Sequence, residues 1–371
     1  MRAKSAFAEY IMSVRTDTRP AIGKDCMTKR RTGRILRITG IVLCCYVIFS
    51  FAATAVFSAV FFGRYDMSAP PAVFDRRITF PSGGHTLTGW LLLSEQPHGI
   101  VVMCHGYHGA ASDGTETASV LRNEGWDVLL FDGTGVGESE GAGTAGLQQG
   151  VLDGAAALDW IAAQDEFRDL PVMLFGFSAG GYAAAVLAAE RKEVVGAVTL
   201  AAFDSPVDLM LSAAHGKAGI LVWLEEPFLR LWQTVRFGAN ADTRPSQTLL
   251  NTDVPILAVH VDGDGNVPME LSLCNRLARS DRDHTEIVIV EGTEHDPLSP
   301  AFPAARRDAL YRQISAFCLA CVNGSDTSPD GRLLPLWRLT TLPVSEASMP
   351  LSGTKWTCLT KRAGIFRPCS I

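Results

Sequence analysis

Charged side chains are scarce in this 371-residue sequence: they make up 19% of it, and the formal net charge is −6. A protein that binds nucleic acid usually carries a basic footprint, with Lys and Arg gathered on one face or along one helix. The acidic balance provides no such footprint, so we expect no nucleic-acid partner. The length allows one large domain with additional segments.

Cysteine does not occur in the pattern of a disulfide scaffold. The nine cysteines are an odd number, and Cys44 and Cys45 fall in a long apolar run. Cys104 lies in a segment that we expect in the core, where a free cysteine acts as a small hydrophobic side chain. The Cys318-x-x-Cys321 pair could be a redox pair, but it has no preceding βαβ pattern, and we interpret it as the end of a helix.

Signals for a metal or a nucleotide cofactor are weak. His105 and His108 have a spacing that could suggest zinc, but two histidines alone do not complete such a site. The glycines at 133, 135 and 137 lack the spacing of a dinucleotide-binding loop and follow a middle strand rather than the first one. We therefore predict no metal and no cofactor.

One long apolar run lies near the N-terminus. Residues 38–62 are 25 residues without an Asp, Glu, Lys, Arg or His, and several basic residues precede them. A helix rises about 1.5 Å per residue, so this run can cross a bilayer core of about 30 Å. The basic flank predicts a cytoplasmic N-terminus and an extracytoplasmic remainder. The alternatives are a buried core helix, or a signal peptide cleaved after Ala53 or Ala55. The protein could begin at Met1 or at Met27.

A serine stands between two glycines in Gly176-Phe177-Ser178-Ala179-Gly180. Residues 171–175 form an apolar run of buried-strand type, and residues 181–190 are an Ala-rich helix former. A serine on such a strand-to-helix turn projects its hydroxyl from the carboxyl edge of a sheet, and the glycines permit the strained, close-packed backbone. The pattern predicts a serine nucleophile.

A serine hydroxyl needs a histidine to take its proton, and the histidine needs a carboxylate to orient it. The predicted strand 254–260 leads into a loop with Asp262 and Asp264, and the predicted strand 285–290 leads into a loop with His295. We assign Asp264 as the acid and keep Asp262 as its alternative. Asp296 adjoins His295, and we interpret it as a loop or helix-cap carboxylate.

From residue 77 to about residue 320, the sequence resembles the α/β-hydrolase superfamily. Within it, the chain looks most like the single-domain esterases and the serine aminopeptidase-like or lysophospholipase-like branch. Further motifs that carry the resemblance are His105-Gly106-Tyr107, the turn 132–139, and the spacing from His260 through Asp264 to Pro268. Thr134 stands where this family usually has an arginine, and Val261 stands where it usually has a glycine.

The resemblance implies an α/β fold: a mostly parallel eight-stranded sheet with helices on both faces and a small helical lid at about 202–250. Ser178 would then attack an acyl carbonyl, His295 would act as general base and then general acid, and Asp264 would orient His295. The oxyanion would be bound by the backbone N–H groups of Tyr107 and Ala179.

These observations predict five segments. They are a basic cytoplasmic N-terminus (1–37), a transmembrane signal-anchor (38–62), a linker (63–76), the hydrolase domain (77–321), and a tail expected to be disordered (322–371). The aromatic and leucine-rich stretch 220–237 is either an apolar lid over an acyl pocket or an ordinary amphipathic helix packed on the core.

The predicted function is serine-dependent hydrolysis of a carboxylic ester, small or lipid-like, through an acyl-enzyme. A serine aminopeptidase-like peptidase is the first alternative, and Glu225 or Glu226 would then capture the amine of the substrate. A catalytically inactive hydrolase-fold binding protein is the second alternative.

Overall fold

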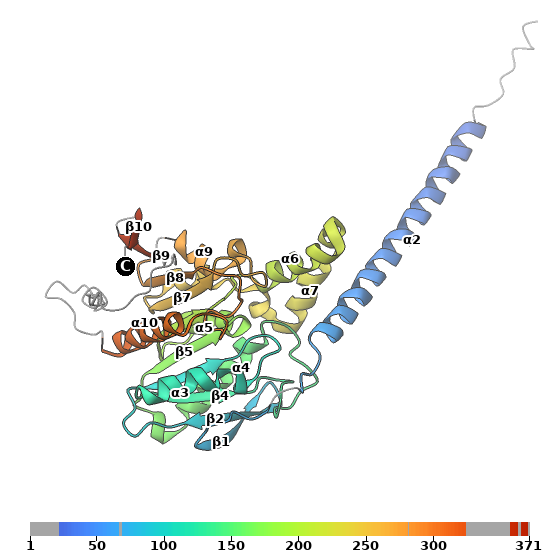
Figure 1. The fold of residues 1–371 in the computed structure, drawn as a ribbon. Coiled ribbons are helices and arrows are strands. Elements are labelled where there is room, and N and C mark those ends of the chain that lie inside the picture. The colour runs from blue at the N-terminus through green and yellow to red at the C-terminus, as the bar shows by residue number, and fades with distance from the viewer. Residues whose placement is uncertain (1–21, 67–68, 281, 324–356, 363–364, 370–371) are drawn as a thin grey trace, which may run out of the picture. The chain divides into compact units, whose positions relative to one another are not determined.

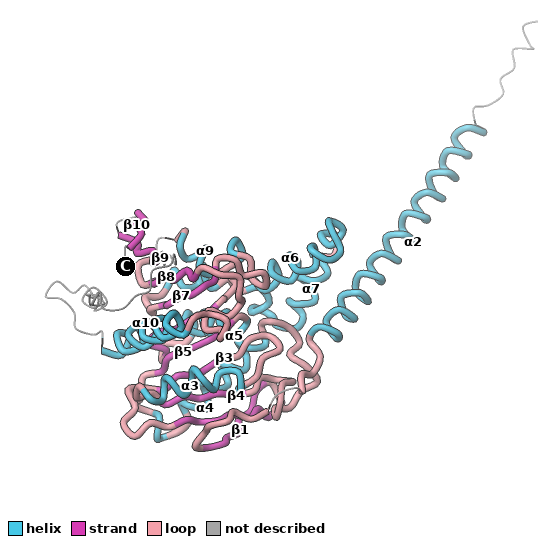
Figure 2. Tube along the Cα trace, viewed as in Figure 1, coloured by secondary structure: helices cyan, strands magenta, loops and turns pink. Residues whose placement is uncertain are grey.

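The computed structural model describes residues 22–66, 69–280, 282–323, 357–362 and 365–369. The chain divides into two compact units, the first ending at Ala53 and the second beginning at Thr54. Figures 1 and 2 show the helices and strands of both units. The first unit contains most of the helix α2 (Ile22–Phe61), and the second contains the sheet and the other helices. The predicted tail segment 324–356 lies outside the described residues.

Between Arg31 and Phe61, the helix α2 is mostly apolar and exposes most of its large apolar side chains. Its part from Arg31 to Phe61 is long and apolar enough to cross a membrane, with a mean hydropathy of 2.3 in its most apolar window. Ile41, Val42 and Leu43 are each at least 60% exposed. A core helix would bury such side chains, so the helix fits a membrane anchor or a signal sequence instead.

The second unit is built on one sheet, with the strand order β1-β2-β4-β3-β5-β6-β7-β8-β9-β10. Strands β3 to β8 run parallel, and β1, β2, β9 and β10 join by antiparallel pairing. The bounds are β1 Arg76–Ser82, β2 His85–Leu92, β3 Ile100–Cys104, β4 Asp127–Phe131, β5 Val172–Phe177, β6 Val194–Leu200, β7 Ile256–Val261, β8 Thr285–Val290, β9 Thr357–Arg362 and β10 Ile365–Cys369. The strands β1 to β8 are the predicted eight-stranded, mostly parallel sheet.

Helices cover both faces of the sheet (Figure 1). They are α3 Thr115–Asn123, α4 Gln149–Ala162, α5 Ala179–Glu190, α9 Leu273–Ala278 and α10 Ala304–Asn323, with short 3-10 turns at Ala111–Gly114, Asp165–Phe167 and Met269–Leu271. Because side chains alternate along a strand, Val102 of β3 packs with α4 and α5, whereas Val101 packs with α3 and α10. Two cores result, one on each face.

The predicted lid region is helical. Between β6 and β7 lie α6 Pro206–Ala218, α7 Glu226–Phe237 and α8 Pro245–Thr248, with 3-10 turns at Gly219–Leu224, Gly238–Asp242 and Leu249–Asn251. Ser205 begins α6 because its hydroxyl accepts the N–H of Asp208 at 3.0 Å, and Pro206 follows as the first helical residue. The helix α7 buries Leu229 and exposes Val235, so it presents apolar side chains on both sides.

The C-terminal tail differs from its expected disorder where the structure describes it. The strand β9 pairs antiparallel with β8, with Leu359 opposite Ile287, and β10 pairs with β9. The edge of β8 offers unpaired backbone groups, which another strand can satisfy whatever its side chains are. The helix α10 also continues to Asn323, two residues beyond the end predicted for the hydrolase domain.

Candidate active site

Ser178 lies on the turn between β5 and α5. Its φ of 54° and ψ of −115° are a conformation that residues with a side chain rarely adopt. The strand ends at Phe177 and the helix begins at Ala179, so the predicted strand-to-helix turn is present. The turn holds the Ser178 side chain at the carboxyl edge of the sheet.

Gly176 and Gly180 are required because the backbone crowds both positions. A Cβ atom added to Gly176 would lie 2.1 Å from the carbonyl oxygen of Gly180. A Cβ atom added to Gly180 would lie 1.9 Å from the carbonyl oxygen of Cys104, at the end of β3. These approaches explain why glycine stands on both sides of the serine.

Three loops bring Ser178, His295 and Asp264 together. The Nε2 atom of His295 lies 2.9 Å from the Oγ atom of Ser178. Its Nδ1 atom lies 2.7 Å from the Oδ2 atom of Asp264. An ionised carboxylate only accepts hydrogen bonds, so Nδ1–H donates to Asp264, which leaves Nε2 able to accept the serine hydroxyl proton.

The surroundings of Asp264 keep it ionised. Its side chain is fully buried, and its Oδ1 atom accepts the backbone N–H groups of Asn266 at 2.8 Å and Val267 at 3.1 Å. Burial alone would raise the pKa of Asp264, but the hydrogen bond and the charge of His295, together with the backbone donors, hold that pKa below its ordinary value. Asp264 is therefore a carboxylate at neutral pH.

The two neighbouring carboxylates have other partners. Asp262 is exposed and accepts the N–H of Gly292 at 3.0 Å. Asp296 accepts the N–H of Leu298 at 2.8 Å, as a turn-capping carboxylate does. The geometry therefore favours Asp264 over Asp262 as the partner of His295.

His260 is a residue of this site that the sequence analysis used only as a spacing marker. It lies at the end of β7 and is fully buried, and its Nε2 atom is 3.0 Å from the carbonyl oxygen of Val267. Val267 in turn donates to Asp264, so His260 fixes the loop that carries the acid. Burial lowers the pKa of His260, although the charge of Asp264 opposes this, and His260 is therefore neutral.

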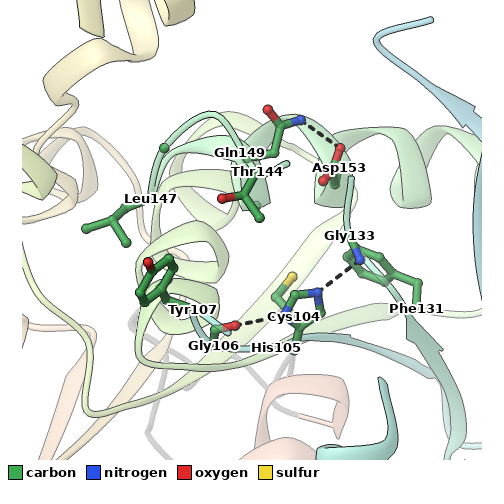
Figure 3. A pocket seen from close by; sticks show the side chains of 13 residues that line it. Cys104, His105, Gly106, Tyr107, Phe131, Gly133, Thr144, Leu147, Gln149 and Asp153 are labelled. Atoms are coloured by element: carbon green, nitrogen blue, oxygen red, sulfur yellow. Dashed lines mark hydrogen bonds between the residues drawn. The ribbon is translucent and has the colours of Figure 1, made fainter. Parts of the chain in front are cut away.

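The predicted oxyanion donors lie on one cavity. Gly106 and Tyr107 follow β3, Ala179 begins α5 directly after Ser178, and all three line this cavity. Figure 3 shows Gly106 and Tyr107 on its wall. The first N–H groups of a helix have no partner within that helix. The N–H of Ala179 is one of these groups, so it is available to a negatively charged oxygen.

His105 joins the two loops that enclose the cavity. Its Nδ1 atom is 2.8 Å from the carbonyl oxygen of Gly106, and its Nε2 atom accepts the N–H of Gly133 at 2.9 Å (Figure 3). Both ring nitrogens are therefore occupied by backbone groups. Within the described residues, no group of three or more His, Cys, Asp and Glu side chains could hold a metal ion.

Asp153 of α4 also lines the cavity, although no motif in the sequence indicates it. It is buried and accepts hydrogen bonds from Ser82 at 2.7 Å, from both the backbone and the hydroxyl of Thr134, and from Gln149 at 3.0 Å. Thr134, which stands in the place of the family's usual arginine, thus binds a buried carboxylate. Asp153 ties β1, the loop after β4 and α4 together.

Glu226 of the lid is engaged within its own helix. Its carboxylate accepts from Arg230 at 2.8 Å, one turn further along α7. Arg230 also binds Asp242 at 2.8 Å and Asp208 at 3.2 Å. The amine-capturing role that the peptidase alternative gives to Glu226 would therefore compete with an existing ion pair.

In sequence, the chain is similar to one family model and to several curated proteins. The family model described as "Serine aminopeptidase, S33" matches residues 95–248. A protein of Mycobacterium tuberculosis strain H37Rv whose name is that of a phosphoribosyl transferase is 33% identical over 141 residues, which are 37% of this chain and 31% of that protein. Human protein ABHD12B is 27% identical over 227 residues, which are 58% of this chain and 61% of that protein. The chain thus spans less than two thirds of these curated relatives.

Solved structures match a larger share of the chain than the curated relatives do. The esterase Pf2001 of Pyrococcus furiosus superposes with a TM-score of 0.52 and 18% identity, covering 69% of this chain and 98% of the esterase. The α/β hydrolase GrgF of Penicillium sp. sh18 gives a TM-score of 0.50 and 20% identity, covering 66% of this chain and 97% of that hydrolase. At such identities the likeness concerns the fold alone. Taken with the sheet order and the Ser178 turn, these matches lead to one conclusion: the chain has the α/β-hydrolase fold, and over residues 95–248 it is similar to the serine aminopeptidase family.

Proposed function

We propose that this protein is a membrane-anchored serine hydrolase that cleaves a carboxylic ester through an acyl-enzyme. The observation that carries the proposal is the chain of hydrogen bonds from Asp264 through His295 to the Ser178 hydroxyl. Such a chain is the arrangement that activates a serine. The backbone N–H groups of Ala179, which directly follows Ser178, and of Tyr107 are the proposed donors that acyl transfer needs.

The proposed reaction begins when Ser178 Oγ attacks the ester carbonyl while His295 Nε2 takes the hydroxyl proton. Asp264 stabilises the imidazolium that forms, and the N–H groups of Tyr107 and Ala179 bind the oxygen that becomes negatively charged. His295 then gives its proton to the leaving alcohol. A water molecule, deprotonated by His295, attacks the acyl-serine and releases the acid and the free Ser178 hydroxyl.

We further propose that the apolar helix is an uncleaved anchor with a cytoplasmic N-terminus, and that the hydrolase domain is extracytoplasmic. The basic residues that precede the apolar run support this orientation. An ester that partitions into or near the membrane would then be a suitable substrate, and small soluble esters would serve as probes.

The test compares the full-length protein in detergent with its Ser178→Ala variant, on aryl esters of increasing acyl length. Ser119→Ala is the matched control, because the Ser119 hydroxyl only bonds the carbonyl of Thr115 within α3. We expect Ser119→Ala to match the wild type and Ser178→Ala to lose about 10⁴-fold or more in kcat. Full ester turnover by Ser178→Ala would contradict the proposal.

Two further measurements separate the alternatives. The match to the serine aminopeptidase model favours a peptidase, so aminoacyl-arylamides are assayed beside the esters. Turnover of the arylamides without turnover of the esters would favour the peptidase. A folded wild-type protein that does not react with a fluorophosphonate probe would support the binding protein.

A further inference from the structure

The residues at the end of the apolar helix contact two loops that contribute residues to the cavity. The strap, defined here as residues 61–65, comprises the last residue of α2 and the four residues after it, and it lies wholly within the second unit. Residues 63–65 belong to the segment expected to be a linker. In the structure they pair instead with the loop after β4, through the bridges of Gly63 with Gly143 and of Tyr65 with Val136.

The backbone of the strap continues this pairing. The N–H of Tyr65 donates to Gly135 and its carbonyl accepts from Gly137, both at 2.9 Å. The carbonyl of Phe62 accepts the N–H of Thr144 at 2.9 Å. The approach at Gly143 is so close that an added Cβ atom would lie 1.9 Å from that same carbonyl oxygen. The loop after β4 is therefore shaped to receive the strap.

Arg64 supplies most of the side-chain contacts of the strap with this loop. Its guanidinium donates to the carbonyl oxygens of Gly137 at 2.8 Å, Ser139 at 2.9 Å and Gly141 at 3.1 Å. An arginine presents several donors in a fixed plane, so one side chain can hold three carbonyl groups in place. Arg64 thereby fixes the middle of the loop that contributes Gly133 and Thr144 to the cavity.

The strap also holds the loop after β3. The hydroxyl of Tyr107 donates to the carbonyl of Phe61, and the Tyr107 ring packs edge-on against the buried ring of Phe62, with 5.7 Å between centroids. Tyr65 stacks on His108 at 5.2 Å. Tyr107 is the residue whose backbone N–H is a proposed oxyanion donor, and Figure 3 shows its side chain on the cavity wall.

We propose that the strap is a positioning element of the active site, which holds the Tyr107 backbone donor and the adjoining cavity wall in the arrangement that catalysis requires. This inference rests on the proposed hydrolase function. The oxyanion donors are effective only when they are already oriented toward the developing charge. A loosened strap therefore lowers the rate of the chemical step more than it weakens binding of the substrate.

The test uses two variants of the full-length protein in detergent. Arg64→Ala removes the contacts with three carbonyl groups, and Tyr107→Phe removes only the hydroxyl that bonds Phe61. Arg77→Ala is the matched control, because Arg77 reaches the same loop through the exposed Glu138 side chain at 3.0 Å and not through the backbone. Thermal unfolding of each variant establishes that it is folded.

The expected kinetic result is a split between kcat and KM. We expect kcat to fall about 10-fold to 100-fold in Arg64→Ala and about tenfold in Tyr107→Phe, with KM within about threefold of the wild type. Arg77→Ala retains the kcat of the wild type. If Arg64→Ala and Tyr107→Phe both keep the kcat of an active wild type, the inference is overturned.

Hydrogen exchange provides a readout that does not depend on activity. In Arg64→Ala, we expect faster backbone exchange at residues 105–109 and 135–144, and no such change in Arg77→Ala. Unchanged exchange in Arg64→Ala overturns the inference even if kcat falls. A wild type without Ser178-dependent turnover rejects the proposed function instead, and the exchange rates then decide alone whether the strap positions these loops.

Discussion

At the scale of single residues, His260 is a buried group that fixes the loop carrying Asp264. It bonds Val267, whose own N–H holds Asp264, and Asp264, Asp262 and His295 are the titratable groups that act on it. Protonating His260 places a charge in the interior, where no solvent stabilises it. The folded protein therefore resists that protonation more than the unfolded chain does.

The resulting prediction concerns pH and stability. Unfolded, His260 has a pKa of about 6.5, and its folded pKa lies lower. Between these two values the unfolded chain binds a proton that the folded protein does not, so the free energy of unfolding falls as the pH decreases below about 6.5. We expect His260→Gln, whose amide can still donate to Val267, to show a shallower loss of Tm between about pH 7.5 and about pH 5.

The control for this measurement is His85→Gln, because His85 is exposed at the first residue of β2. We expect its pH profile of Tm to follow that of the wild type. A His260→Gln profile that parallels the wild type over the whole range would contradict the assignment of His260 as a neutral, buried group.

The site was only partly predictable from the sequence. Ser178, Asp264 and His295 carry local signatures, because flanking glycines or a preceding apolar strand mark each of them. Asp153 carries none: its partner Ser82 is 71 residues away, and only the folded sheet brings the two together. Arg64 could not be recognised either, because it lies in the segment expected to be a linker. Its partners are backbone carbonyl groups, which every residue has, so no sequence pattern identifies them.

At the scale of elements, an ion-pair network holds the lid helices to each other. Arg230 of α7 binds Asp208 of α6 and Asp242, and Arg244 binds Asp208 at 2.7 Å. Exposed ion pairs contribute little singly, about 0–1 kcal/mol each, but these share partners across several elements. The network therefore matters more for the order of the lid than for the stability of the sheet.

We predict that Arg230→Ala loosens the lid selectively. Limited proteolysis should cut the region 206–244 faster than in the wild type, and Tm should change by only a few degrees. The control is Arg168→Ala, whose exposed partner Asp165 lies outside the lid. Equal cleavage rates in Arg230→Ala and the wild type would show that apolar packing alone orders the lid.

The strands differ in how well the sequence predicts them. The first two strands, Arg76–Ser82 and His85–Leu92, are marked in the sequence by the turn-forming glycines Gly83 and Gly84 between them. The strands β9 and β10 were missed. They join an existing edge through backbone pairing, so they need no apolar period of the kind that marks the central strands.

At the scale of the whole molecule, the length of the apolar run favours retention over cleavage. A secretory signal has an apolar region of about 7–15 residues, whereas this run has 25. We predict that the protein, tagged at its C-terminus, stays in membranes washed with alkaline carbonate at the mass of a chain that begins at Met1 or Met27. A soluble product shortened at Ala53 or Ala55 would instead identify a cleaved signal peptide.

The position of the strap also has a mechanical consequence. Phe61, the last residue of α2, accepts the hydroxyl of Tyr107, a residue that lines the cavity. A pulling force applied to the helix would load this hydrogen bond and the Arg64 contacts before it reached any strand of the sheet. Tension in the helix would thus act first on the loops after β3 and β4, which contribute residues to the cavity.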